Sequence, residues 1–365
     1  MTTAAILQKL AAVRSYLTAA SSSLGQAIVS IDDLAKLLSA DLTKHARCGA
    51  LHAANGQTGI QAFVANTSYY DCVHPVWYAV NTDGVGVRAL ASEADPTVLT
   101  AAKGAGVRVW PTVAADPGVP AIVRAMMSDA AKRAAHIALL VKLVAAKDYV
   151  GLDLDYEHLS QLGDKALFTA FAYEATAAFH AVGKKLSVCV QGLSHPVAEN
   201  WADYLALAGI VDAIHVMAYD YHPGWQNHAG PVSPTGWVDQ IGAHIASTGH
   251  PEKFILGLPN YGCTIGWPGP QTALADCVTA AGANYAVISS HMASCSYNDG
   301  TPKILDTREP NAHHVTYGDF YFDDALSLEE KVKIARDRGL AGIYHWTIGG
   351  EPPGFFDMVR RYYPA

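Results

Sequence analysis

The sequence lacks the features of several large classes of protein. Its 25 Lys and Arg residues are outnumbered by 33 Asp and Glu residues, so the net charge is −8 and gives no basic footprint for nucleic acid or anionic lipid. The longest mainly apolar stretch, Ala134–Ala146, contains His136 and Lys142 and is shorter than the roughly 20 residues of a membrane-spanning helix. We therefore expect neither nucleic acid nor a membrane as a partner.

Motifs for common cofactors and metals are also missing. No G-x-G-x-x-G follows the first apolar run, and neither an H-E-x-x-H motif nor a C-x-x-C pair occurs. We expect no cofactor and no metal site. Cysteine is sparse: Cys189 lies in an apolar run typical of a buried free thiol, while a single disulfide is compatible with the loop-rich stretch that holds Cys263, Cys277 and Cys295.

The first 56 residues differ in character from the rest. Apolar residues recur at helical spacing over 6–17 and again over 24–38, with three serines between the two segments. The segment His45–Gln57 is small and polar, as linkers are. We expect a helical hairpin and linker over 1–56 and the main domain over 57–365. Periodicity leaves open whether the hairpin packs on that domain or serves docking or export.

The main domain alternates short apolar runs with longer helical patterns. This alternation predicts parallel strands joined by right-handed crossovers, and eight such units in about 300 residues favour an α/β fold of the (β/α)₈ TIM barrel type over an open sheet. A loop-rich stretch over about 261–320 predicts a small insertion before the eighth strand. The expected strands are Ile60–Val64, Val76–Val80, Val107–Val113, Tyr149–Tyr156, Leu186–Val190, Ala213–Ala218, Phe254–Leu258 and Gly342–Thr347.

One of these strands carries a row of acids. In Tyr149–Glu157, apolar residues alternate with Gly151, Asp153, Asp155 and Glu157. One face of the strand is therefore apolar, and the other carries three carboxylates, with successive ones about 6.5 Å apart along the strand. The apolar face suits the surrounding helices, which leaves the acids inside the barrel with Glu157 nearest the C-terminal rim, where barrel enzymes keep their active sites. Such a row must retain some protons, because its members repel one another.

Two other interpretations of this row remain open at this point. A solvated edge strand with chance acids would show the same alternation. Three carboxylates also suit a hard cation, although the segment lacks the glycine and the spacing of a calcium loop.

The segment resembles the D-G-x-D-x-D-x-E signature of glycoside hydrolase family 18, the chitinases and their relatives. Gly151, Asp153, Asp155 and Glu157 fill its positions, whereas Val150 stands where the family has its first Asp. Three further segments resemble the family's motifs in order: Met217-Ala-Tyr-Asp220, Gly257-Leu-Pro-Asn-Tyr-Gly262 and Gly342-Ile-Tyr-His-Trp346. Shorter segments, such as Trp77-Tyr78 and Tyr321–Asp324, are similar to the bacterial spore-lytic and cell-wall subgroup.

The resemblance implies a role for each matching residue. Glu157 would protonate the glycosidic oxygen, and the substrate's own 2-acetamido oxygen would attack the anomeric carbon in place of an enzyme nucleophile. Asp155 would hold the acetamido N–H and raise the pKa of Glu157 by its charge, Asp153 would share a proton with Asp155, and Tyr219 would donate to the acetamido carbonyl. The residues implied for substrate binding are Met217, Asp220, Tyr261 and Trp346. Three aromatics predicted at the rim could extend a sugar groove or could equally pack under the insertion: Trp110, Trp225 and Trp267.

The implied activity is retaining hydrolysis of β-1,4-linked N-acetylglucosaminyl polymers, either chitin or the glycan strands of peptidoglycan. The alternative is a carbohydrate-binding barrel without turnover, against which the retained Glu157 argues. Such substrates lie outside the cytoplasm, so we expect action in the cell envelope or beyond, although Lys9 and Arg14 interrupt any signal-like apolar run.

Overall fold

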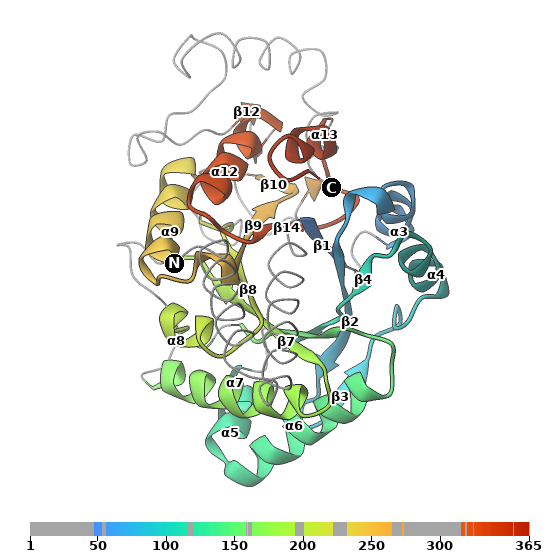
Figure 1. Ribbon diagram of the computed structural model, residues 1–365, viewed down its shortest axis with the longest axis vertical. Coiled ribbons are helices and arrows are strands. Elements are labelled where there is room, and N and C mark those ends of the chain that lie inside the picture. The colour runs from blue at the N-terminus through green and yellow to red at the C-terminus, as the bar shows by residue number, and fades with distance from the viewer. Residues whose placement is uncertain are drawn as a thin grey trace, which may run out of the picture.

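The computed structural model describes most of the chain from Arg47 onward. The described residues are 47–52, 56–115, 120–157, 159, 163–193, 201–221, 232–264, 272–273, 315–317, 320–323, 325–352 and 354–364. Parallel strands close into a barrel ringed by helices (Figure 1). The predicted (β/α)₈ barrel is therefore confirmed.

The barrel has eight parallel strands, counting β4 and β5 together as an interrupted third strand. Each strand pairs in parallel with its two neighbours, and β1 closes the ring by pairing with both β14 and β2. In order around the ring the barrel strands are β1 (Arg47–Leu51), β2 (Cys72–Val80), β4 (Arg108–Val109) with β5 (Thr112–Ala114), β6 (Gly151–Asp155), β7 (Lys185–Gln191), β8 (Ala213–Met217), β9 (Phe254–Pro259) and β14 (Gly342–Trp346). A short β3 (Val87–Ala89) runs antiparallel to β2.

The first barrel strand is not where the sequence predicted it. The expected strand Ile60–Val64 lies inside a helix, α3 (Gly56–Ala65), in which Phe63 is wholly buried and Val64 is 42% exposed. The true first strand is β1, inside the segment expected to be a linker. Its Gly49 looked like a linker residue, but a Cβ there would lie 2.5 Å from His345 Nε2, so the glycine permits close packing. The domain therefore includes β1 from Arg47 onward, and the predicted hairpin lies outside the described residues.

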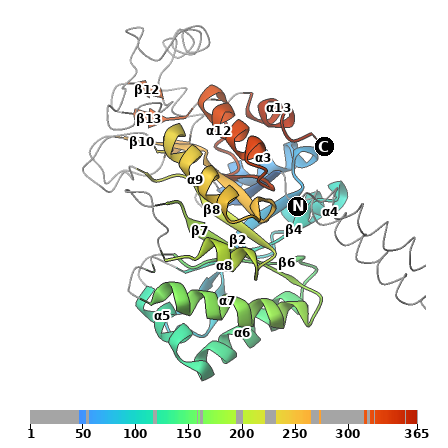
Figure 2. The same ribbon diagram turned by 60° about the vertical axis from the view of Figure 1, so that its left-hand side comes forward.

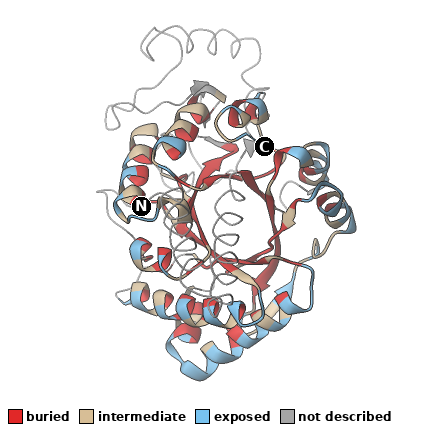
Figure 3. Ribbon diagram, in the orientation of Figure 1, coloured by how far each residue is buried: buried red, intermediate tan, exposed pale blue. Residues whose placement is uncertain are grey.

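Helices cover the outside of the barrel and bury one face each. Figure 3 shows buried strands enclosed by helices whose outer faces are exposed. Local signals start them: Asp95 accepts hydrogen bonds from the backbone N–H groups of Thr97 and Val98, and Asp129 caps its own helix in the same way. After α3 the helices are α4 (Pro96–Ala105), α5 (Pro120–Ser128), α6 (Ala130–Ala145), α7 (Asp164–His180), α8 (Tyr204–Ala208), α9 (Thr235–Ser247), α12 (Ala325–Asp337) and α13 (Phe355–Arg360).

The predicted insertion before the last strand forms a separate antiparallel sheet. Its strand order is β11-β10-β13-β12, and Figure 2 shows β10, β12 and β13 together beside α12. The bounds are β10 (Tyr261–Thr264), β11 (Thr272–Ala273), β12 (Val315–Tyr317) and β13 (Phe320–Phe322). Cys277 and Cys295 lie outside the described residues, so the predicted disulfide stays a prediction. In the described part of the chain, no helix has the length and apolar character needed to cross a bilayer.

Candidate active site

The acid row of β6 points into the barrel. The alternating apolar residues Leu152, Leu154 and Tyr156 are wholly buried on the other side of the strand. There the Tyr156 hydroxyl lies 2.7 Å from Nε2 of His136 on α6, and its ring stacks on Phe171 of α7. Because side chains alternate along a strand, Asp153 and Asp155 face the interior, as the sequence predicted. The edge-strand interpretation is wrong, since β6 pairs with both β5 and β7.

Asp153 is held by donors from three other strands. Oδ1 accepts hydrogen bonds from the Ser187 hydroxyl at 2.6 Å and from His215 Nδ1 at 3.0 Å. Oδ2 accepts from the Thr112 hydroxyl at 3.2 Å and the Cys189 thiol at 3.1 Å. His215 lies on β8, which β7 separates from β6, so its contact with Asp153 crosses the barrel interior.

These contacts fix the charge of Asp153. Burial by itself raises the pKa of its carboxyl, but His215, His74 and the Ser187 hydrogen bond together hold that pKa well below its ordinary value. Both of its oxygens are occupied by these donors. These contacts favour the carboxylate form of Asp153 in the free protein, and the proton that the resemblance has Asp153 share with Asp155 stays a prediction.

Asp155 and Glu157 behave in the opposite way. Burial raises the pKa of Asp155 well above its ordinary value, and the carboxylates of Glu157 and Asp153 raise it further. Asp155 Oδ1 is buried and has no hydrogen-bond partner. Glu157 is partly exposed past the end of β6, and loss of solvation there raises its pKa to about 7, with a second contribution from the charge of Asp220. One acid therefore keeps its proton near neutrality at the mouth of the barrel.

Asp220 is a second charged neighbour of Glu157, in addition to Asp155, whose own pKa the Glu157 carboxylate raises. Asp220 follows β8 in a left-handed conformation with φ of 57°, a strained state for a residue other than glycine. The Tyr261 hydroxyl donates to Asp220 Oδ1 at 2.5 Å. Burial raises the pKa of Asp220 to about 6, against the lowering effect of that hydrogen bond.

The remaining motif residues form one apolar surface beside these acids. Tyr219 and Tyr261 are buried with their ring centroids 6.0 Å apart, and the partly exposed Met217 and Trp346 pack against them. Gly257 on β9 leaves room for this arrangement, because a Cβ there would lie 3.0 Å from Cε1 of Tyr219. The structure thus brings together at the C-terminal strand ends every site residue predicted from the sequence except Asp153, which lies deeper.

Sequence reasoning missed the residues that surround Asp153. Thr112, Ser187, Cys189 and His215 each lie at an inward position of a strand, and strand alternation was the signal that could have found them. One rim prediction is wrong: Trp110 is wholly buried and stacks on His74 with ring centroids 5.8 Å apart. Trp225 and Trp267 lie outside the described residues.

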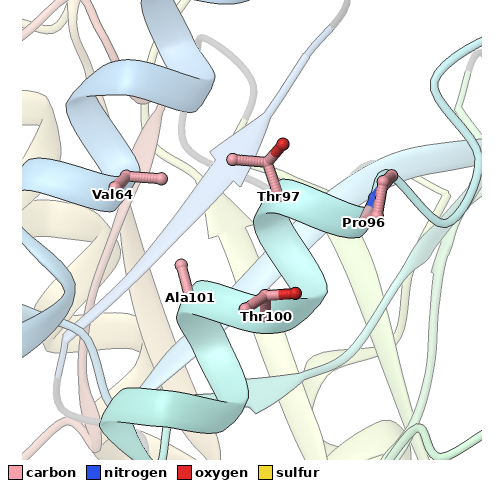
Figure 4. A pocket seen from close by; sticks show the side chains of 5 residues that line it. All are labelled: Val64, Pro96, Thr97, Thr100 and Ala101. Carbon is pink, nitrogen blue, oxygen red and sulfur yellow. The ribbon is translucent and has the colours of Figure 1, made fainter.

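An open depression on the outside of the barrel has no part in this chemistry. It lies between α3 and α4, and none of its lining side chains is ionisable (Figure 4). Those side chains are Val64, Pro96, Thr97, Thr100 and Ala101.

Known structures share this fold. A chitinase from Chromobacterium violaceum superposes with a TM-score of 0.67 at 22% identity, over 88% of this chain and 99% of the other. The spore cortex-lytic enzyme SleL of Bacillus cereus also gives a TM-score of 0.67, at 19% identity over 86% of this chain and 73% of the other. At such identities the likeness establishes the fold alone.

Sequence relatives and a family model go further. The cortical fragment-lytic enzyme of Bacillus subtilis is 26% identical over 209 residues, which cover 54% of this chain and 46% of that protein. A class V chitinase of Arabidopsis thaliana is 25% identical over 256 residues, which cover 62% and 65%. The chain spans about half the length of the curated relatives it matches. The model of glycosyl hydrolases family 18 matches residues 120–351, more than half of the chain, and with four of that family's motifs meeting at one barrel mouth, the chain belongs to this family.

Proposed function

We propose that the protein is a retaining glycosidase that cleaves β-1,4-linked N-acetylglucosaminyl polymers, chitin or peptidoglycan glycan, with the substrate's acetamido group as nucleophile. The observation that carries the proposal is the place of Glu157 just past the end of β6 and within electrostatic range of Tyr219, where loss of solvation raises its pKa to about 7. An acid that keeps its proton near neutrality can protonate a glycosidic oxygen.

The other carboxyls of the row are poor candidates for an enzyme nucleophile. Asp153 is engaged by four donors and lies below the mouth. Asp155 has a pKa well above its ordinary value, so its nucleophilic carboxylate form is disfavoured in the free enzyme. A nucleophile supplied by the substrate removes the need for either, which supports attack by the acetamido oxygen.

Asp155 is suited to receive the acetamido N–H. Its Oδ1 is buried without a hydrogen-bond partner, so an incoming N–H donor satisfies it. The positive charge that develops on the substrate as the oxazolinium ring forms favours the ionised form of Asp155. We assign to the Tyr219 hydroxyl a hydrogen bond to the acetamido carbonyl, and to Trp346 the stacking surface for the sugar ring.

The reaction then runs in two balanced steps. Glu157 gives its proton to the leaving oxygen as the acetamido oxygen bonds to the anomeric carbon and the glycosidic bond breaks. Glu157, now a carboxylate, takes a proton from water as the water oxygen attacks the same carbon and opens the oxazolinium ring. Two inversions at one carbon give a product of retained β configuration.

Purified protein should be tested side by side on chitin, peptidoglycan, cellulose and fully deacetylated chitosan. We expect reducing ends from chitin or peptidoglycan and none from the two polymers without acetamido groups, with the β-anomer as the first product by NMR. An α-anomer or comparable cleavage of chitosan would contradict substrate assistance. Binding of an N-acetylated polymer without turnover would favour the non-catalytic carbohydrate-binding alternative.

A further inference from the structure

The lower half of the barrel interior holds a second group of reactive side chains that the proposed glycosidase does not use. Cys48 on β1 and Cys72 on β2 are paired in register, and His74 lies two residues after Cys72, on the same face of β2. All three residues are wholly buried. One ligand atom from each lies within 4.8 Å of the others, and the Cys72 sulfur is 3.3 Å from His74 Nε2.

The separation of these atoms matches metal coordination. With Zn–S bonds of about 2.3 Å and Zn–N bonds of about 2.0 Å, a tetrahedral zinc ion holds a thiolate sulfur and a ring nitrogen about 3.5 Å apart. Two thiols and an imidazole are donors that zinc prefers, whereas calcium and magnesium prefer oxygen. None of the three described cysteines, Cys48, Cys72 and Cys189, is in a disulfide.

Two buried nitrogen atoms beside this group have no partner. They are His74 Nδ1 and His215 Nε2, on rings that meet edge to face with centroids 4.5 Å apart. His215 Nδ1 lies 3.0 Å from Asp153 Oδ1, and a carboxylate can only accept, so His215 donates there. A carboxylate that orients a histidine in this way is a common second partner of metal ligands.

We propose that Cys48, Cys72 and His74 bind a zinc ion in the lower half of the barrel, beside His215, whose ligand atom lies within 4.8 Å of those of His74 and Asp153. The site lies near the N-terminal ends of the strands, where features of this fold serve stability rather than catalysis. It joins β1 to β2, the pairing through which β1 closes the ring. Its role is therefore structural, and it is independent of the proposed function at the mouth.

The first test measures zinc in the full chain. Cys263, Cys277 and Cys295 are replaced by serine, so that the remaining thiols are Cys48, Cys72 and Cys189. After gel filtration with a weak chelator, mass spectrometry of the elements should find about one zinc per chain. Cys48→Ser and Cys72→Ser should each lower zinc content at least tenfold, whereas Cys189→Ser, the matched control, should retain it. Substoichiometric zinc in the parent, or equal zinc in all variants, would overturn the proposal.

A second measurement needs no further variant. The parent is unfolded with chelator and refolded with cobalt(II), which reports thiolate ligands through sulfur-to-cobalt charge-transfer absorption. We expect that absorption and a higher Tm than without metal, and the absence of both would overturn the proposal even if the cysteine variants did not fold. A mass lower by two hydrogens with two thiols lost would show a Cys48–Cys72 disulfide instead. Because polymer hydrolysis is a separate readout, failure of the zinc site is distinguishable from failure of the glycosidase.

Discussion

Asp153 and Asp155 lie two residues apart on the same face of β6, yet their surroundings shift their pKa values in opposite directions. Asp153, in the lower half, receives four side-chain hydrogen bonds and has a pKa well below its ordinary value. Asp155, one step nearer the mouth, has a buried oxygen without a partner and a pKa well above its ordinary value. The strand supplies both acids, but the neighbouring strands decide which of them keeps its proton.

The lower and upper halves of the barrel interior therefore differ in the side chains that surround their acids. In the lower half, β5, β7 and β8 provide two hydroxyls, a thiol and an imidazole that donate hydrogen bonds to Asp153. Above, around Glu157 and Asp220, burial raises the pKa of each acid and few donors oppose it. The lower half is arranged for a permanent charge, and the upper half is arranged for a proton that can be transferred.

The largest effect should come from removing a whole barrel strand. Deleting residues 1–56 removes β1 and with it both the β1–β14 and β1–β2 pairings. The sequence placed the main domain over 57–365, so this truncation would leave it whole. With β1 in place of a linker, we expect no cooperative unfolding transition and no soluble monomer. Deleting residues 1–44 keeps β1 and is the matched control, which should unfold cooperatively. A folded, active product of the longer deletion would contradict the assignment of β1.

The next largest effect should come from the acid at the mouth. Glu157→Gln should lower kcat by at least about 10³-fold on an N-acetylglucosamine oligomer, because the group that protonates the leaving oxygen is lost. Its Tm should change little. Glu174→Gln, on the outer helix α7 where Glu174 pairs with Arg133, is the matched control and should keep full activity. Near wild-type hydrolysis by Glu157→Gln would remove the general acid from the account.

The same substitution in the two aspartates should separate catalysis from stability. Asp155→Asn should lower kcat about 100-fold with little change in the free energy of unfolding, because Oδ1 loses no hydrogen bond. Asp153→Asn should destabilise the fold by about 3 kcal/mol, since the buried network loses its negative charge and one of its two acceptor oxygens becomes a donor. Denaturant unfolding and steady-state kinetics on both proteins measure the contrast. Equal losses of stability in the two variants would mean that the two halves do not differ as described.

The smallest effect should be a shift in pH dependence. A general acid works only while protonated, so kcat/KM of the wild type should fall as pH rises through about 7, the pKa of Glu157. Asp220→Asn removes the negative charge that raises this pKa, so the alkaline limb should move to lower pH. Asp239→Asn, at a surface ion pair with Arg338, should leave the limb in place. A limb that stays put or moves upward in Asp220→Asn would contradict this coupling.

Strand periodicity and motif order carried much of the sequence-based prediction. The alternation in β6 placed the acids inside the barrel, and the motif residues at the ends of β8, β9 and β14 do meet at one mouth. The first barrel strand was missed because β1 is only five residues long and contains Gly49. A glycine is needed there because His345, nearly 300 positions away in sequence, leaves no room for a Cβ.

The charge states were out of reach of the sequence for the same reason. Nothing local to Asp153 shows that Ser187 and His215 will contact it inside the barrel, or that Asp220 will act on Glu157 as well. Such contacts depend on strand register, which sets the side chains of distant segments at one level of the barrel.

The contrast between the two halves can be tested by carbon-13 NMR titration of the side-chain carboxyls of Glu157 and Asp153, assigned through Glu157→Gln and Asp153→Asn. We predict that the Glu157 carboxyl titrates with a midpoint near 7, whereas the Asp153 resonance stays that of a carboxylate down to the lowest pH at which the protein is folded. A Glu157 midpoint at the ordinary value of about 4.3, or an Asp153 carboxyl that takes up its proton above its own ordinary value, would contradict the account.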